Sequence, residues 1–265
     1  MTPRRALLRI GIVAMLVSVP LMAGAAYGVG PLARVTPTAQ VTDPREIVAR
    51  SLQAVIDASS VHVETALAGT IPGALVGRPG GGVQLDGTRA TLDVRPQDAR
   101  SRLDFASPVL ATHVESISSW DTLAYRIDGG AWARGSVADV AAATGISIDP
   151  LTVVDQARTW LAAPGAPVPS VARVACDVPS GVCREVTLSL GAESGALLRG
   201  LFPGDASADL GSASVSIVLL ADAQTLRPAH LRVSAQTADG SLAATLEADF
   251  TNWDGPSVIP DPPGG

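Results

Sequence analysis

The sequence contains no lysine, since all 19 of its basic residues are arginine. This absence excludes chemistry that needs a lysine, such as a Schiff base or a P-loop. Aromatic residues are also scarce, at 3% of the chain, whereas apolar residues make up 47%. That apolar content is too high for a disordered chain, and a length of 265 residues allows one large domain or two small ones.

Positive charge is in deficit as well. The 19 basic residues face 25 acidic ones, which gives a net charge of −6. Residues 1–25 hold three of the arginines and no acid, so the rest of the chain is more acidic still. An acidic body of this kind repels nucleic acid and anionic lipid headgroups, and nucleic-acid binding is therefore excluded.

Residues 1–30 predict a signal peptide or a signal-anchor helix. Three arginines precede an uncharged run from Ile10 to Gly30, the order that the secretion machinery reads. Ala23-Gly24-Ala25 offers a cleavage site, whereas the length of the run also suffices to span a bilayer uncut. Both alternatives place the remaining chain outside the cytoplasm, secreted or anchored to the cytoplasmic membrane.

The two cysteines, Cys176 and Cys183, flank a Pro-Ser-Gly turn between two strand-like runs. They should face each other across a hairpin, which predicts a disulfide in an oxidising compartment. A metal site is the weaker alternative, because His62, His113 and His230 are scattered singly.

Residues 31–42 are rich in proline and threonine and are typical of a tether. Thr42 or Asp43 should cap a helix with Pro44 near its first position, and shorter helices are expected at 136–145, 150–165 and 195–202.

Most other segments alternate apolar and polar residues with period two, as in Val61, Val63, Thr65 and Leu67 against His62, Glu64 and Ala66. About nine or ten antiparallel strands are expected. The order of elements predicts an α+β domain over 43–260, followed by a flexible tail at 261–265.

Five motifs follow one another along the chain: SLQAVIDASSVHVETALAGTI, GVQLDGTRATLDVRP, LAYRIDGGAWARG, ADAQTLRPAHLRVSAQ and ATLEADFTNWDGPSVIPDPP. This order of motifs resembles the LolA-like lipoprotein-carrier superfamily, and within it the actinobacterial branch of the envelope carriers LppX and LprG. The resemblance implies a curved antiparallel sheet forming an unclosed half-barrel, with a few helices covering its concave face. One departure is clear: Leu21-Met22-Ala23-Gly24-Ala25 has alanine where the lipobox cysteine of that branch stands. Lipid anchoring in the family manner is therefore not available.

The resemblance further implies a non-enzymatic carrier that binds a lipid or another hydrophobic ligand in the cell envelope, with no cofactor. An alanine-rich core leaves room for such a ligand, whereas a closed core is the alternative. A closed core would suit a membrane-tethered sensor or interaction protein that binds a protein partner. The residues expected to line a cavity are Val154, Leu161, Leu198, Leu219, Val233 and Leu246.

Catalytic motifs are not evident. Neither Gly-x-Ser-x-Gly nor His-Glu-x-x-His occurs, so no serine-hydrolase elbow or zincin site is predicted, and a secreted hydrolase is the weakest function considered. His62 and Glu64 lie two residues apart on one strand face, as do His113 and Glu115. A paired base or half a metal site is one interpretation, and the polar face of an edge strand is the ordinary one.

Overall fold

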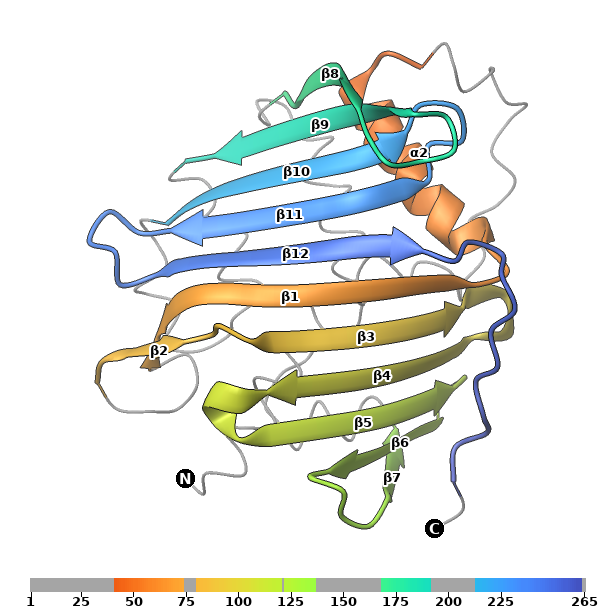
Figure 1. Cartoon of the computed structure of the whole chain (residues 1–265), viewed down its shortest axis with the longest axis vertical. Helices are drawn as coiled ribbons and strands as arrows, with labels where there is room; N and C mark the ends of the chain where they lie inside the picture. The colour runs from red at the N-terminus through yellow and green to blue at the C-terminus, as the bar shows by residue number, and fades with distance from the viewer. Residues whose placement is uncertain (1–40, 74–79, 121, 137–167, 192–212, 264–265) are drawn as a thin grey trace.

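The computed structural model describes residues 41–73, 80–120, 122–136, 168–191 and 213–263. These residues form a large twisted sheet with one α-helix against it (Figure 1). The helix is α2 (Pro44–Asp57). The strands are β1 (Val61–Pro72), β2 (Gly82–Gln84), β3 (Thr88–Arg95), β4 (Arg100–Ser107), β5 (Thr112–Ser119), β6 (Thr122–Ile127), β7 (Ala133–Ser136), β8 (Ser170–Ala175), β9 (Val182–Leu190), β10 (Ser214–Asp222), β11 (Pro228–Gln236) and β12 (Ala243–Thr251). Two short 3-10 turns, η4 (Pro96–Asp98) and η5 (Pro108–Leu110), connect β3 to β4 and β4 to β5.

Helix α2 begins where the sequence predicts. Asp43 is its N-cap, and the Asp43 carboxylate accepts a hydrogen bond of 2.9 Å from the backbone N–H of Arg45. Pro44 occupies the first turn, where its missing N–H costs no hydrogen bond. Ile47 and Val55 are fully buried, and the helix contacts β9, β11 and the η4 turn between β3 and β4. The apolar face of α2 is thus held against the sheet.

The strands alternate between two faces. On β1, Val61, Val63 and Thr65 are buried, whereas Glu64 and Ala66 between them are exposed. We call the side of Val61 and Val63 the inner face and the side of Glu64 the outer face. The cross-strand register carries this division through the sheet, because directly opposite residues share a face. The period-two pattern in the sequence therefore predicted the two faces correctly.

The strand order is β7-β6-β5-β4-β3-β1-β12-β11-β10-β9-β8, with β2 added beside β1. All neighbouring strands are antiparallel, and the outermost strands β7 and β8 do not pair with each other. The sheet is consequently an unclosed half-barrel, as expected, although it has 12 strands rather than nine or ten. The first and last long strands, β1 and β12, meet at its centre.

After β12 the chain continues as a strap, residues 252–263, which runs along the strand ends from β1 toward β7 (Figure 1). Arginines of the outer face hold it: Arg100 donates to the carbonyl oxygen of Ile259 at 3.2 Å, and Arg134 donates to those of Pro262 and Pro263. Ile259 is 3% exposed and Val258 is 89% exposed, so the strap has a buried and a free side.

Several expected elements lie outside the described residues. These are the N-terminal segment, most of the tether, the helices expected at 150–165 and 195–202, and the helix expected at 136–145 except for Ser136, which ends β7. Within the described part of the chain, no helix is both long and apolar enough to cross a membrane.

Candidate functional site

The inner face carries two hydrophobic clusters. The first lies under α2, where Ile47 and Val55 pack with sheet residues that include Val63, Leu231 and Phe250. Its members are almost completely buried, with Ile47, Val55 and Val63 each 0% exposed. This cluster is the close-packed part of the core and fixes the helix to the sheet.

The second cluster lies on β9, β10 and the β11–β12 hairpin, and its buried members are Leu188, Leu190, Ala213, Val215 and Leu242. Half-buried apolar side chains surround it, and we call these five residues the apolar patch: Ile71, Ile217, Val233, Ala235 and Ala244. Ile217 and Val233 are register partners, as are Ala235 and Ala244, so the patch is continuous across β10, β11 and β12. The inner positions of these three strands bear no charged side chain over the patch.

Three of the predicted lining residues can be placed. Leu219, Val233 and Leu246 all lie on the inner face of β10, β11 and β12, and Val233 stands directly opposite Leu246. Leu219 and Leu246 are each 6% exposed, whereas Val233 is half-buried. Val154, Leu161 and Leu198 lie outside the described residues. The sequence thus selected neighbouring residues of one surface, and their role in lining a cavity stays a prediction.

The histidines belong to the outer face. Each makes a hydrogen bond with an aspartate of a neighbouring strand: His62 with Asp93 at 2.7 Å, His113 with Asp104 at 3.0 Å and His230 with Asp249 at 2.7 Å. The expectation that His62 and Glu64 lie on an edge strand is wrong, because β1 is flanked by β3 and β12. Spacing alone could not reveal this, since the partners of β1 are distant in sequence.

Burial of the His62 ring lowers its pKa, but the hydrogen bonds and charges of Asp93 and Glu64 more than offset this effect, and the pKa is raised above its usual 6.5. Glu64 reaches the other ring nitrogen at 3.4 Å. No group of three or more metal-ligating side chains occurs among the described residues. His62 and Asp93 form a cross-strand ion pair when the imidazole is protonated.

A pocket of about 240 Å³ lies beside His62, between the outer face and the strap. Its lining consists of Ser60, Val61, His62, Asp93, Asn252, Pro256, Ser257 and Val258. Sequence reasoning did not find this pocket, because half of its wall comes from a segment almost 200 residues away along the chain. The lining of the pocket is mostly polar, and the pocket lies on the face opposite the apolar patch.

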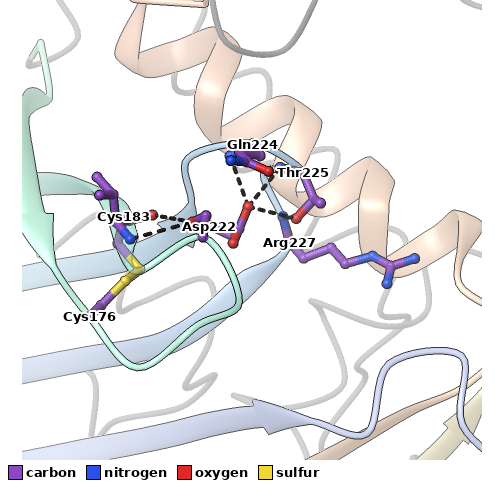
Figure 2. Close-up of a disulfide and its surroundings, with 8 residues drawn as sticks. Cys176, Cys183, Asp222, Gln224, Thr225 and Arg227 are labelled. Atoms are coloured by element: carbon purple, nitrogen blue, oxygen red, sulfur yellow. Dashed lines mark hydrogen bonds between the residues drawn. A yellow bond between two sulfur atoms is a disulfide. The ribbon is translucent and has the colours of Figure 1, made fainter.

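The predicted disulfide is present, joining Cys176 and Cys183 with a Cα–Cα distance of 5.8 Å. Figure 2 shows it beside the turn between β10 and β11, where the Asp222 carboxylate accepts hydrogen bonds from the backbone N–H groups of Gln224 and Thr225, both at 2.8 Å. Burial raises the pKa of Asp222, but these bonds and one from Ser180 outweigh it and lower that pKa overall. Cys183 is the register partner of Asp222, so the cross-linked loop and the turn brace each other.

Three tryptophans fall within the described residues. Trp253 stacks on Phe250 with ring centroids 6.4 Å apart, and the Arg227 guanidinium lies over it at 5.2 Å. Trp132 carries Arg126 above its ring at 5.0 Å, whereas Trp120 is 72% exposed. Cation–π contacts thus hold two of these three tryptophan rings in place.

Comparison with known proteins gives structural similarity only. No protein-family model matches the chain, and no curated protein matches it. Among solved structures it is similar to the Mycobacterium tuberculosis lipoprotein LppX, at 14% identity and a TM-score of 0.49, over 82% of this chain and 98% of LppX. It is also similar to a LolA superfamily protein from Nitrosomonas europaea, at 10% identity and a TM-score of 0.29, over 83% of this chain and 96% of that one. A third similar structure, an uncharacterized conserved protein from Thermus thermophilus, has 11% identity and a TM-score of 0.37, over 78% of this chain and 85% of that one.

The LolA-like, LppX-type fold that the sequence motifs imply is thus the fold of two proteins to which this chain is similar. The function proposed below rests on the chain's own sheet.

Proposed function

We propose that this protein is a non-enzymatic binding protein for a lipid or another hydrophobic ligand, and that the ligand lies on the inner face of the sheet outside the cytoplasm. The observation that carries the proposal is the apolar patch. A sheet that does not close leaves one face to be covered by something else, and α2, the helix that the structure describes, contacts β9, β11 and the η4 turn.

The chemistry of the patch favours an apolar occupant. Its five side chains are aliphatic and half-buried, and no charged residue interrupts them at the inner positions of β10, β11 or β12. Transfer of an acyl chain from water onto such a surface gains about 25 cal/mol for each Å² removed from water. The resemblance of the sequence to envelope lipid carriers supports the same ligand class, and the disulfide favours an oxidising compartment.

The first experiment is native mass spectrometry of the full chain purified from its own cell envelope, followed by extraction with organic solvent. We expect a lipid at stoichiometric amount, together with saturable uptake of a fluorescent long-chain acyl probe by the emptied protein. Absence of both the adduct and the uptake would overturn the proposal in favour of a protein that binds a protein partner.

A matched pair of variants locates the ligand. Ala244 and Ala243 are neighbours on β12, with Ala244 half-buried on the inner face and Ala243 exposed on the outer face. Ala244→Trp fills the patch and should weaken uptake of the acyl probe by about tenfold or more. Ala243→Trp places the same ring on the outer face and should leave uptake unchanged. Equal uptake by both variants, each shown to be folded by its circular dichroism, would exclude the patch as the site.

A further inference from the structure

The pocket beside His62 lies between the outer face and the strap, on the other side of the sheet from the apolar patch. Residues 60–62 and Asp93 form one wall, and Asn252 with residues 256–258 forms the other. Its volume of about 240 Å³ is smaller than the roughly 300–1,000 Å³ of pockets that hold drug-sized ligands. A ligand in this pocket is therefore small, and the sheet separates it from any molecule on the inner face.

Hydrogen bonds hold the strap in place on both flanks of the pocket. Ser60 Oγ donates to the carbonyl oxygen of Gly255 at 2.7 Å, and the Asp254 N–H donates to the carbonyl oxygen of Ser60 at 3.0 Å. Farther along the strap, the Arg95 guanidinium donates to the carbonyl oxygen of Ser257 at 3.5 Å. The two walls are thus bonded to each other, so the pocket is formed before a ligand binds.

Polar groups with unused hydrogen-bonding capacity line both walls. Among the described residues, the side chains of Asn252 and Ser257 have no hydrogen-bond partner. On the opposite wall, Asp93 bonds His62 through one carboxylate oxygen, and these two side chains are 37% and 23% exposed. An amide and a hydroxyl each donate and accept, whereas a carboxylate accepts. This set of groups matches a ligand with neighbouring hydroxyl groups.

The backbone of Asn252 does not by itself explain the side chain. Asn252 has a left-handed conformation, φ +49°, which asparagine tolerates better than most residues. Ala99 and Ala111 adopt the same conformation, at φ +49° and +46°, without an amide. Asn252 is also the only asparagine of the sequence. Its amide is therefore available for a role other than shaping the turn.

The charges around the pocket favour an uncharged ligand. Asp93 stands between two basic register partners, His62 on β1 and Arg102 on β4. A cationic ligand would have to compete with both for this carboxylate, and an anionic ligand would meet the carboxylate itself. A neutral hydroxyl group can bond the second oxygen of Asp93 without either cost.

Apolar atoms border these polar groups. Val258 is 89% exposed and Pro256 is also exposed, although both line the pocket. The C–H groups of a ligand that lay against Val258 would remove its apolar surface from water. The pocket thus offers hydrogen bonds on one side of a ligand and an apolar contact on another.

We propose that the pocket under the strap binds one neutral sugar ring, a pyranose, whose hydroxyl groups bond Asn252, Ser257 and Asp93. The C–H face of the ring lies against Val258. This site goes beyond the proposed function, because it lies on the opposite face of the sheet and takes a polar ligand. A free monosaccharide and the terminal residue of a polysaccharide share this chemistry, and the tests below distinguish them.

The first test titrates the full chain with glucose, mannose and galactose while NMR follows the methyl resonances of Val258. At least one of the three should shift these resonances, with a Kd of about 1 mM. The uronate and the amino sugar that correspond to it should bind at least about tenfold more weakly, because each carries a charge. Absence of a shift with all three sugars, or equal binding of a charged counterpart, would overturn the proposal.

Methylation of the anomeric hydroxyl group separates the two sources of the ring. The terminal residue of a polysaccharide carries its linkage at this position, so its methyl glycoside should bind as tightly as the free sugar does. A site for a free monosaccharide should instead lose at least about fivefold in affinity on methylation, because one hydroxyl group no longer donates.

The second test removes the two polar groups of the strap. Asn252→Gly deletes the amide and keeps a residue suited to the left-handed backbone, and Ser257→Ala deletes the hydroxyl group. Each should weaken sugar binding about fivefold. Because the Ser257 hydroxyl has no partner among the described residues, Ser257→Ala should leave the thermal midpoint of the protein unchanged.

Ala111→Gly is the matched control for Asn252→Gly. Ala111 is exposed and left-handed as well, but it lies between β4 and β5 and outside the pocket. Both variants carry the same cost of a new glycine in the unfolded chain, and Ala111→Gly should bind the sugar as the unmodified chain does. Unchanged binding by both Asn252→Gly and Ser257→Ala would overturn the assignment of the sugar to this pocket.

Discussion

At the residue scale, polar groups on the outer face are arranged in pairs across strands. The register sets Glu64 directly opposite Asp249, and Asp104 directly opposite Glu115. Like charges in that position destabilise a sheet. His62, His230, His113 and Arg126 each bond one of these carboxylates. Basic groups therefore offset a repulsion that the alternation of the strands alone would leave in place.

The His62 pair gives stability a dependence on pH. The folded pKa of His62 is raised above 6.5, so its contribution is fully present below pH 6.5 and is lost as the pH rises through the folded pKa. As the pH rises above 6.5, the thermal midpoint should therefore fall, by less in His62→Gln than in the unmodified chain. The difference should correspond to about 1 kcal/mol or less, because the pair is partly exposed.

Thermal unfolding at several pH values measures this effect. Because the two proteins differ at His62 alone, the difference between their pH profiles reports on this side chain. A His62→Gln variant whose midpoint falls as steeply as that of the unmodified chain would contradict the ion pair.

At the element scale, the disulfide loop and the β10–β11 turn are bonded to each other at the β8–β11 end of the sheet. The backbone N–H of Ala223 donates to the carbonyl oxygen of Val182 at 3.0 Å, which ties the turn to the loop. The Asp222 carboxylate closes the turn itself by accepting from Gln224 and Thr225. A covalent bond thus fixes the register of β8 and β9, and a hydrogen-bonded turn fixes that of β10 and β11, which bear three of the five residues of the apolar patch.

Removal of the cross-link should destabilise the protein without altering the ligand face. In the chain-entropy model, a bridge between residues seven apart contributes about 2.5 kcal/mol. A Cys176→Ser, Cys183→Ser double variant should lose about that much free energy of unfolding in a denaturant titration. Uptake of the acyl probe by the folded variant should be unchanged. A loss well below 1 kcal/mol would mean that the loop is held by the turn alone.

The elements that the sequence predicted are those with a local signal. The cap at Asp43, the two faces of β1 and the cysteine hairpin each depend on residues close together in the chain. The pairing of β1 with β12 has no such signal, because its register is set by long-range packing. For the same reason the sequence selected Val233 and Leu246 as lining residues but could not show that they stand opposite each other.

At the scale of the whole molecule, the strap connects parts that the sheet alone leaves far apart. It leaves β12 at the centre, and Asp254 accepts from Ser59 and binds Arg227. Farther along, Arg100 binds Asp261 at 2.6 Å, and Arg134 of β7 holds the carbonyl oxygen of Pro263 at 2.7 Å. An unclosed sheet has free ends. Because the strap is bound both at the centre of the sheet and at β7, it limits how far the β7 end of the sheet can move away from the centre.

Two neighbouring residues of the strap test this role. Ile259 is 3% exposed, whereas Val258 is 89% exposed, so the same substitution probes the buried and the free side. Ile259→Asp places a charge among buried apolar atoms and should cost about 3 kcal/mol of unfolding free energy, with faster amide exchange in β6 and β7. Val258→Asp should cost less than about 0.5 kcal/mol and leave exchange unchanged. If Ile259→Asp alters exchange no more than Val258→Asp does, the strap does not restrain that end of the sheet, and the arginine contacts to its carbonyl oxygens are surface contacts alone.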